Sequence, residues 1–105
     1  MIRNGKTRAK ILLGEFSRFL GNETLRVRIY QDRRTRVCER EVVERDGTSF
    51  VMVLPFREVT ALRDLLSEDP HFVHVRADVE RMLSRVTSAL RVSDATANTS
   101  GNTLP

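Results

Sequence analysis

The segment LRVRIY at residues 25–30 alternates apolar and polar side chains without a break. Successive side chains of a β-strand point to opposite faces of a sheet. The segment therefore predicts a strand with leucine, valine and isoleucine on one face. Two arginines and a tyrosine lie on the other face.

Similar patterns lie on both sides of this strand. Before it, the apolar alternation that follows Lys10 changes phase around Gly14, which predicts a strand with a bulge or sharp bend. After it, residues 35–45 predict a weaker strand whose two faces are both mixed, and the apolar residues 49–54 predict a strand covered on both faces.

Turn residues separate these strands. Gly21-Asn22 predicts a turn, and the polar residues 31–34 predict a loop. Asp46-Gly47 predicts a type I′ hairpin turn, in which both central residues have positive φ. The four strands are therefore expected to form an antiparallel sheet.

Two helices are expected after the sheet. Pro55 suits the first turn of a helix that ends near Ser67, and Asp69 can cap a second helix with Pro70 at its first position. In this second helix, residues 70–91, an apolar stripe recurs at spacings of three and four. It consists of Phe72, Val75, Val79, Met82, Val86 and Leu90. The stripe must pack on the sheet, on the first helix or on a second copy, and we expect it to form a dimer interface.

The chain is long enough for one domain. We predict an α+β fold, a curved four-stranded antiparallel sheet followed by two helices, which forms a homodimer. The domain is expected to span residues 10–91, after a mobile basic arm at residues 1–9. Residues 92–105 are polar, contain no lysine or arginine, and are expected to form a disordered tail.

The positive charge is concentrated in the first half of the chain. Residues 1–45 contain 12 basic and 6 acidic residues, whereas residues 46–105 contain 6 basic and 8 acidic residues. Of the 18 basic residues, 16 are arginine, whose planar guanidinium suits phosphate oxygens and stacks on bases. No apolar run is long enough to span a membrane, so we expect a cytoplasmic protein without a membrane partner.

Few residues suit catalysis or metal binding. Cys38 is the single cysteine and is expected to pack as a small apolar residue. His71 and His74, with Asp78, share a helical face, but no other histidine or cysteine completes a metal shell. We therefore expect no enzyme activity, no cofactor and no metal.

The arginines of the strands instead indicate nucleic-acid binding. If the strands pair as hairpins, their polar sides combine into one sheet surface, on which we predict the binding residues Arg18, Arg26, Arg28, Tyr30, Arg36 and Arg40. Arginines neutralise the phosphates of a single strand, and its bases stack on aromatic or guanidinium planes. A solvated arginine face, with Glu39 and Glu41 in cross-strand ion pairs, gives the same pattern.

The segment GTSFVMVLPFREVTALRDLL, Gly47 to Leu66, resembles the Pur, Whirly and positive-cofactor-four group of single-stranded DNA-binding transcriptional regulators. The resemblance covers residues 10–66, with Leu25 to Tyr30 similar to the group's second strand. It implies a sheet that binds nucleic acid and helices that mediate dimerisation. By resemblance, the strand arginines and Tyr30 contact single-stranded DNA or RNA.

Two other functions stay open. One is a protein-interaction or assembly module that works through the amphipathic second helix. The other is a duplex-DNA repressor with an N-terminal strand in the major groove, which is disfavoured because four strands precede the helices. The sequence does not distinguish DNA from RNA.

Overall fold

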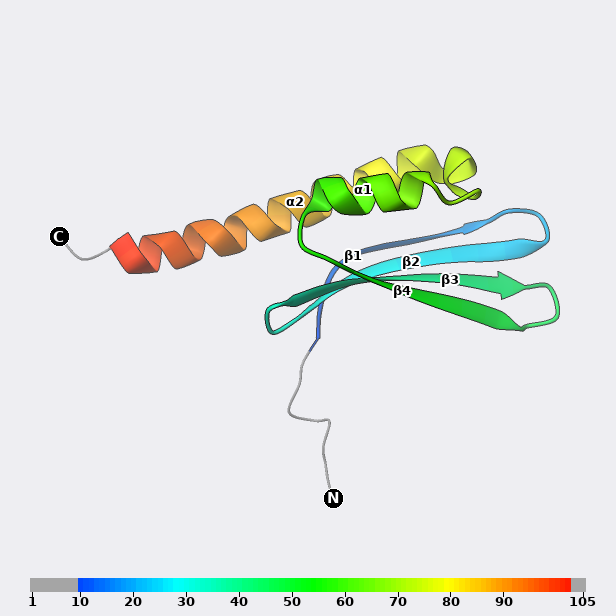
Figure 1. Cartoon of the computed structure of the whole chain (residues 1–105), viewed down its shortest axis with the longest axis horizontal. Helices are drawn as coiled ribbons and strands as arrows, with labels where there is room; N and C mark the ends of the chain where they lie inside the picture. Colours follow the sequence, from blue (N-terminus) through cyan, green and yellow to red (C-terminus); the bar gives the residue numbers. More distant parts are fainter. Residues whose placement is uncertain (1–9, 103–105) are drawn as a thin grey trace, which may run out of the picture.

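The computed structural model describes residues 10–102, and for residues 92–102 it describes the backbone alone. Four strands are followed by two helices (Figure 1), which confirms the predicted α+β class. The elements are β1 (Ile11–Phe19), β2 (Glu23–Asp32), β3 (Thr35–Glu44), β4 (Ser49–Phe56), α1 (Val59–Ser67) and α2 (Phe72–Asn102). The predicted arm, residues 1–9, lies outside the described residues.

The sheet is a simple antiparallel meander in the order β1-β2-β3-β4. The register between β1 and β2 shifts between Leu12 and Gly14, which confirms the bulge predicted at this glycine. Gly14 also lies directly beneath α2. A Cβ atom at this position would come within 3.0 Å of Val86 Cγ2 and 3.2 Å of Met82 Cγ. The absence of a side chain at Gly14 thus lets the long helix approach the edge strand closely.

The hairpin predicted at Asp46-Gly47 is present, but its turn is one residue longer than a type I′ turn. Gly47 has a φ of +92°, whereas Asp46 does not have positive φ. Glu44 N–H donates to the Thr48 carbonyl at 2.7 Å, and Gly47 N–H donates to the Glu44 carbonyl at 2.9 Å. Three residues therefore lie between the closing pair, the loop in which a glycine with positive φ follows a type I turn.

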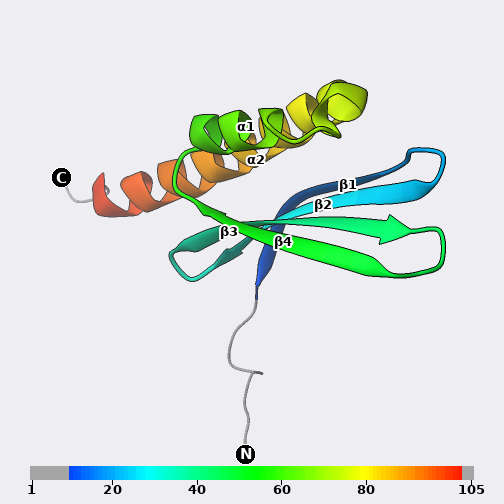
Figure 2. The same ribbon diagram turned by 45° about the vertical axis from the view of Figure 1, so that its right-hand side comes forward.

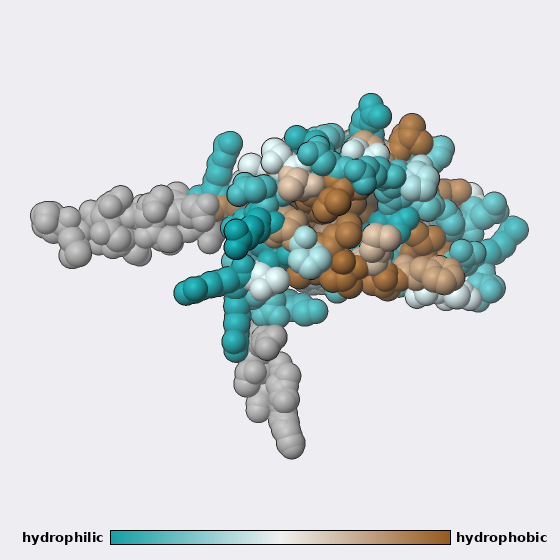
Figure 3. Space-filling model, in the orientation of Figure 1, coloured by the Kyte–Doolittle hydropathy of each residue, from teal (hydrophilic) through white to brown (hydrophobic). Residues whose placement is uncertain are grey.

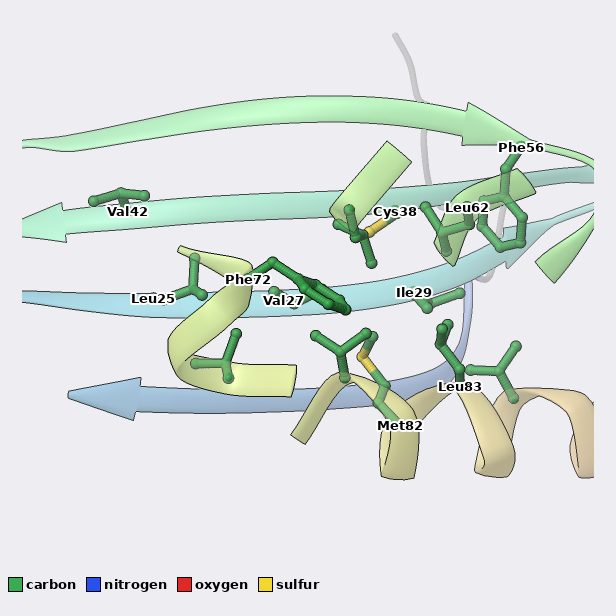
Figure 4. Close-up of a cluster of buried hydrophobic side chains, with 14 of the residues drawn as sticks. Leu25, Val27, Ile29, Cys38, Val42, Phe56, Leu62, Phe72, Met82 and Leu83 are labelled. Carbon is green, nitrogen blue, oxygen red and sulfur yellow. The ribbon is translucent and has the colours of Figure 1, made fainter. Parts of the chain in front are cut away.

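Both helices lie on one face of the curved sheet and leave the other face open (Figure 2). The core between the layers contains Leu25, Val27 and Ile29 of β2 with Cys38 and Val42 of β3 (Figure 4). The helices contribute Leu62 and Leu66 together with the α2 stripe Phe72, Val75, Val79, Met82, Val86 and Leu90, whose members are 0–8% exposed. The stripe thus packs on the chain's own sheet, so the prediction that these six residues form a dimer interface is wrong.

The first helix begins later than the sequence pattern suggested. Pro55 lies inside β4, and α1 begins at Val59. Proline is tolerated here because β4 is an edge strand, where a residue whose N–H would point outward loses no bond to the sheet. Asp69 Oδ1 accepts a hydrogen bond from His71 N–H at 2.9 Å just before α2, as a capping residue does.

The second helix is longer than expected. It has a kink at Val75, with φ −128° and ψ 20°, and continues to Asn102. The expected disordered tail is therefore corrected for residues 92–102, because each residue added to an existing helix gains a backbone hydrogen bond. Residues 103–105 lie outside the described residues. Among the described helices, none is both long and apolar enough to cross a membrane.

The last strand also differs from its prediction. Its apolar residues were expected to be covered on both faces, but Phe50, Val51, Met52 and Val53 are 59%, 53%, 49% and 54% exposed. The reason is topological: β4 is an edge strand whose Val51 and Val53 face away from the helices, and of the two helices only the short α1 lies beside it, whereas α2 packs on β1. A long apolar edge is thus left open by the single chain.

Candidate nucleic-acid interface

The open face of the sheet brings together three of the six residues predicted to bind nucleic acid. Arg26, Arg28 and Tyr30 follow one another on β2, on the face away from the buried Val27 and Ile29. Lys10 Nζ lies 5.2 Å from the centre of the Tyr30 ring. The alternation of residues 25–30 therefore predicted this part of the surface correctly.

Carboxylates on β3 offset the charge of these arginines. The Glu41 carboxylate contacts both Arg26, at 3.4 Å, and Arg28, at 3.1 Å, and Glu39 lies 3.5 Å from Arg28. The register explains the contacts, because Arg26 pairs with Glu41 and Arg28 pairs with Glu39. The cross-strand ion pairs considered as an alternative are thus present, and the centre of the open face is close to neutral.

The other three predicted arginines lie on the opposite, helix-covered face. Arg18 pairs with Leu25 and Arg40 pairs with Val27, while Arg36 pairs with Gln31. Because directly paired residues share a face, these side chains point towards the helices. The expectation that all six residues form one exposed surface is therefore wrong. The sequence of β3 has apolar and charged residues on both faces, so it did not indicate which face is buried. In the structure Cys38 and Val42 are buried, which places the face of β3 that carries Arg40 towards the helices.

Two of these arginines have carboxylate partners in the helical layer. Arg18 contacts Asp78 of α2 at 2.6 Å. Arg40 forms an ion pair with Asp69, and both side chains are nearly buried, at 13% and 12% exposed. Burial lowers the pKa of the Arg40 guanidinium. Both arginines thus fasten the helices to the sheet.

Two of the residues considered for catalysis and metal binding, His71 and Cys38, have contacts that stabilise the fold. His71 Nε2 lies 2.5 Å from Glu23 Oε2, and its Nδ1 lies 3.1 Å from Asp69 Oδ1 and 3.0 Å from Arg40 Nη2. Among the described residues, no group of three histidine, cysteine or carboxylate side chains is arranged so that it could hold a metal ion. Cys38 is fully buried, and this burial raises the pKa of its thiol to about 12. The thiol therefore packs as a small apolar side chain, as predicted.

Arginines do converge at one end of the sheet, beside the β2–β3 turn. A groove of about 500 Å³ is lined there by three arginines and by apolar residues that include Pro55 and Phe56. A second groove of about 310 Å³ shares two of those arginines and adds one each from α1 and α2. Together these arginine grooves are lined by Arg34, Arg36, Arg57, Arg63 and Arg91.

The arginine grooves contain little negative charge. Among their described lining residues, Glu58 is the one carboxylate. Arg36 Nη1 donates to the Arg57 carbonyl at 2.8 Å, and Arg63 forms an ion pair of 3.1 Å with Glu80 on the exposed surface. Within residues 10–91, Arg34, Arg57 and Arg91 are exposed and have no ion pair with a carboxylate. Their guanidinium groups are therefore available to an anionic ligand.

The β2–β3 turn presents a further arginine at the same end of the sheet. Arg33 has a φ of +60°, a conformation that is uncommon for residues other than glycine. Gln31 supports the turn, because its Nε2 donates to the Arg33 carbonyl at 3.1 Å. Strained residues of this kind often occur at functional sites, where the surrounding structure holds them.

Of the five groove residues, the sequence identified Arg36 alone as a binding residue. The adjacent arginines Arg33 and Arg34, in the polar stretch 31–34, are a local sequence signal for a basic turn at this site. Arg63 and Arg91 are 28 positions apart in sequence. They meet only because the two helices pack together, and no local pattern in the sequence indicates that approach. Comparisons with protein-family models, with curated proteins and with solved structures found no match.

Proposed function

We propose that this chain binds single-stranded nucleic acid through the arginine grooves. The observation that carries the proposal is the convergence of five arginines from β3, both helices and two connections, with one carboxylate among the described lining residues. Guanidinium groups bind phosphate oxygens through parallel hydrogen bonds, and several of them at one place favour a polyanion. The element order, four antiparallel strands and then helices, agrees with the resemblance described above.

The apolar lining favours a single strand over a duplex. The larger groove combines three arginines with four apolar residues, Pro55, Phe56, Ala61 and Leu65. Unpaired bases expose their flat faces and can pack against apolar or guanidinium surfaces, whereas stacked duplex bases cannot. In proteins that bind single-stranded nucleic acid, each base stacked on an aromatic side chain contributes about 1–3 kcal/mol.

Tyr30 extends this surface to the open face. Its neighbour Gln31 is the register partner of Arg36, so the ring lies at the same end of the sheet as the grooves. A strand bound in the grooves can therefore continue past this end and stack a base on the Tyr30 ring. In this arrangement Arg26 and Arg28, which are paired with Glu41, contribute little.

The test is the affinity of the full chain for a labelled oligonucleotide, measured by fluorescence anisotropy over a range of salt concentrations. Oligo-dT, oligo-U and a duplex of equal length are compared. The triple variant Arg34→Gln, Arg57→Gln and Arg91→Gln is expected to bind more weakly. Removing one phosphate-binding arginine lowers the salt slope by about 0.7 for a single strand, so the slope should fall by up to about 2.

A charge-matched variant controls for net charge. Arg26→Gln, Arg28→Gln and Arg81→Gln also removes three positive charges, but from side chains that already contact carboxylates outside the grooves. This control should lose much less affinity than the groove variant. Equal losses in both variants, or no binding of wild type at low salt, would refute the proposal.

A further inference from the structure

The strongest unexplained feature outside the arginine grooves is the apolar edge formed by β4. Figure 3 shows apolar side chains gathered over β4 and the adjoining part of α1. The strand SFVMVLPF has no charged residue, and its central residues are about half exposed. Leu65 of α1, 43% exposed, lies beside it, in a groove of about 280 Å³ that is also lined by Met52 and Leu54.

The backbone of this edge is also open. Glu44 N–H donates to the Thr48 carbonyl, which makes Glu44 and Thr48 a hydrogen-bonded pair. In an antiparallel ladder such pairs alternate with pairs whose N–H and C=O groups point away from each other. The backbone groups of Ser49, Val51 and Val53 therefore point away from β3, towards solvent. Pro55 belongs to the same outward set, so its missing N–H breaks no bond to β3.

The two edge strands of the sheet, β1 and β4, differ in how well they are protected against pairing with another chain. Edge strands of stable monomers are usually protected by charges, bulges or covering elements. β1 has the bulge at Gly14, the charged residues Glu15 and Arg18, and contacts with α2. From Ser49 to Leu54, β4 has no bulge and no charged residue, and the helix beside it is the short α1 rather than α2. Pairing of β4 with β1 of another molecule is therefore disfavoured, whereas pairing of β4 with itself meets no obstacle.

We propose that two copies of the chain pair through β4 in an antiparallel, two-fold symmetric arrangement that joins their sheets into one. With the axis beside Val51, the two Val51 residues exchange hydrogen bonds, and Ser49 of each copy pairs with Val53 of the other. This register uses every outward N–H before Pro55. It brings valines together on the open face and places Phe50 and Met52 of each copy beside the groove that Met52, Leu54 and Leu65 line in the other.

Symmetry and charge both favour a second copy of the chain as the partner that pairs with the β4 edge. An antiparallel strand is complementary to itself, so the same row of donors and acceptors meets itself about the axis. No charged side chain of β4 opposes a like charge, because the strand has none. Among the strands of residues 10–102, β4 is the one free edge of this kind, so assembly through it ends at a dimer. It further explains why the sequence of β4 is typical of a strand covered on both faces.

The proposal is tested without nucleic acid, so its outcome is independent of the binding function. Sedimentation equilibrium of the full chain should show a mass that rises with concentration from 12.0 kDa towards twice that value. Hydrogen exchange measured by NMR should show the amides of Ser49, Val51 and Val53 becoming protected as concentration rises. The amides of Phe50 and Met52, which bond to β3, should be protected throughout.

Two variants of β4 and one control variant on α2 test whether self-association occurs through this edge. Val51→Pro removes an outward N–H without breaking a bond to β3, and should weaken self-association about tenfold or more, because symmetry removes two intermolecular hydrogen bonds at once. If the proline variant fails to fold, Val53→Lys serves as the second test. It places a charge on the same edge and should also weaken self-association. Val73→Lys, at a 66% exposed position on α2, should leave association unchanged.

Three results would overturn the proposal. The first is a chain that stays monomeric at all concentrations. The second is a dimer in which the amides of Val51 and Val53 exchange as fast as in the monomer. The third is a folded Val53→Lys variant, confirmed by its NMR spectrum, that associates as strongly as wild type.

Discussion

Replacing Gly14 with alanine tests how closely α2 packs on β1. The added Cβ atom would lie 3.0 Å from Val86 Cγ2, 3.2 Å from Met82 Cγ and 3.5 Å from the Met82 carbonyl oxygen. Ordinary contacts between carbon atoms are about 3.5–4.0 Å, so the helix or its side chains must move. Val86 is β-branched and fully buried, which leaves it few other rotamers.

The expected cost follows from two opposing effects. Overpacking of a well-packed core costs about 1–3 kcal/mol. Replacement of a glycine by alanine lowers the conformational entropy of the unfolded chain, which stabilises the fold by about 0.4–1 kcal/mol where the native φ is compatible. Gly14 meets this condition because it does not have positive φ. The net destabilisation should be about 1–2 kcal/mol, which for a domain of this size lowers Tm by about 5–15 °C.

The assay is urea unfolding followed by circular dichroism, applied to a double-mutant cycle with Val86→Ala. Val86→Ala alone should destabilise the fold by about 2 kcal/mol, because two buried methyl groups are removed. In that background Gly14→Ala should cost at least about 0.5–1 kcal/mol less, because the closest atom has been removed. If Gly14→Ala is neutral in wild type, or the two costs simply add, the close approach of α2 does not limit this position.

Two further predictions concern single side chains. Because burial raises the pKa of Cys38 to about 12, with Glu39 adding to the shift, iodoacetamide at about pH 8 should alkylate the thiol at a rate set by unfolding. Mass spectrometry should show urea accelerating this reaction, and rapid alkylation under native conditions would contradict it. The hydrogen bond from Thr48 N–H to the Asp46 carboxylate, 2.9 Å long, lowers the pKa of Asp46 in the folded state. This contribution to stability is therefore present above the unfolded pKa of about 3.9 and is lost as pH falls through the lower folded value. Urea midpoints of wild type and Asp46→Ala should converge over that interval, and a constant difference between them would count against the hydrogen bond.

The sequence predicted the sheet well because its strands are marked locally. The alternation of residues 25–30 requires one buried face, the bulge lies where the alternation changes phase at Gly14, and the hairpin depends on a positive φ that Gly47 adopts easily. The exact loop was missed because Asp46-Gly47 is compatible with turns of two lengths. The start of α1 was missed because Pro55 suits an edge strand as well as a helix.

The candidate site was harder to predict because it depends on contacts between elements. Whether Arg40 is exposed depends on which face of β3 is buried, and the sequence of β3 has apolar and charged residues on both faces. The grooves depend on the approach of Arg91 to Arg57, which lies in another part of the sequence. Charge composition therefore indicated the kind of ligand, whereas only the tertiary structure indicates where it would bind.

The connection between α1 and α2 is attached to the sheet by a cluster of polar and charged side chains: Asp69 contacts Arg40 and His71, and His71 contacts Glu23. Loss of one partner from such a cluster leaves another charge partly buried without compensation, which is more costly than exchanging the whole set for apolar residues. Stable sequence variants of this domain should thus replace these four positions in concert, and a library randomised at all four should yield folded proteins that single substitutions cannot reach.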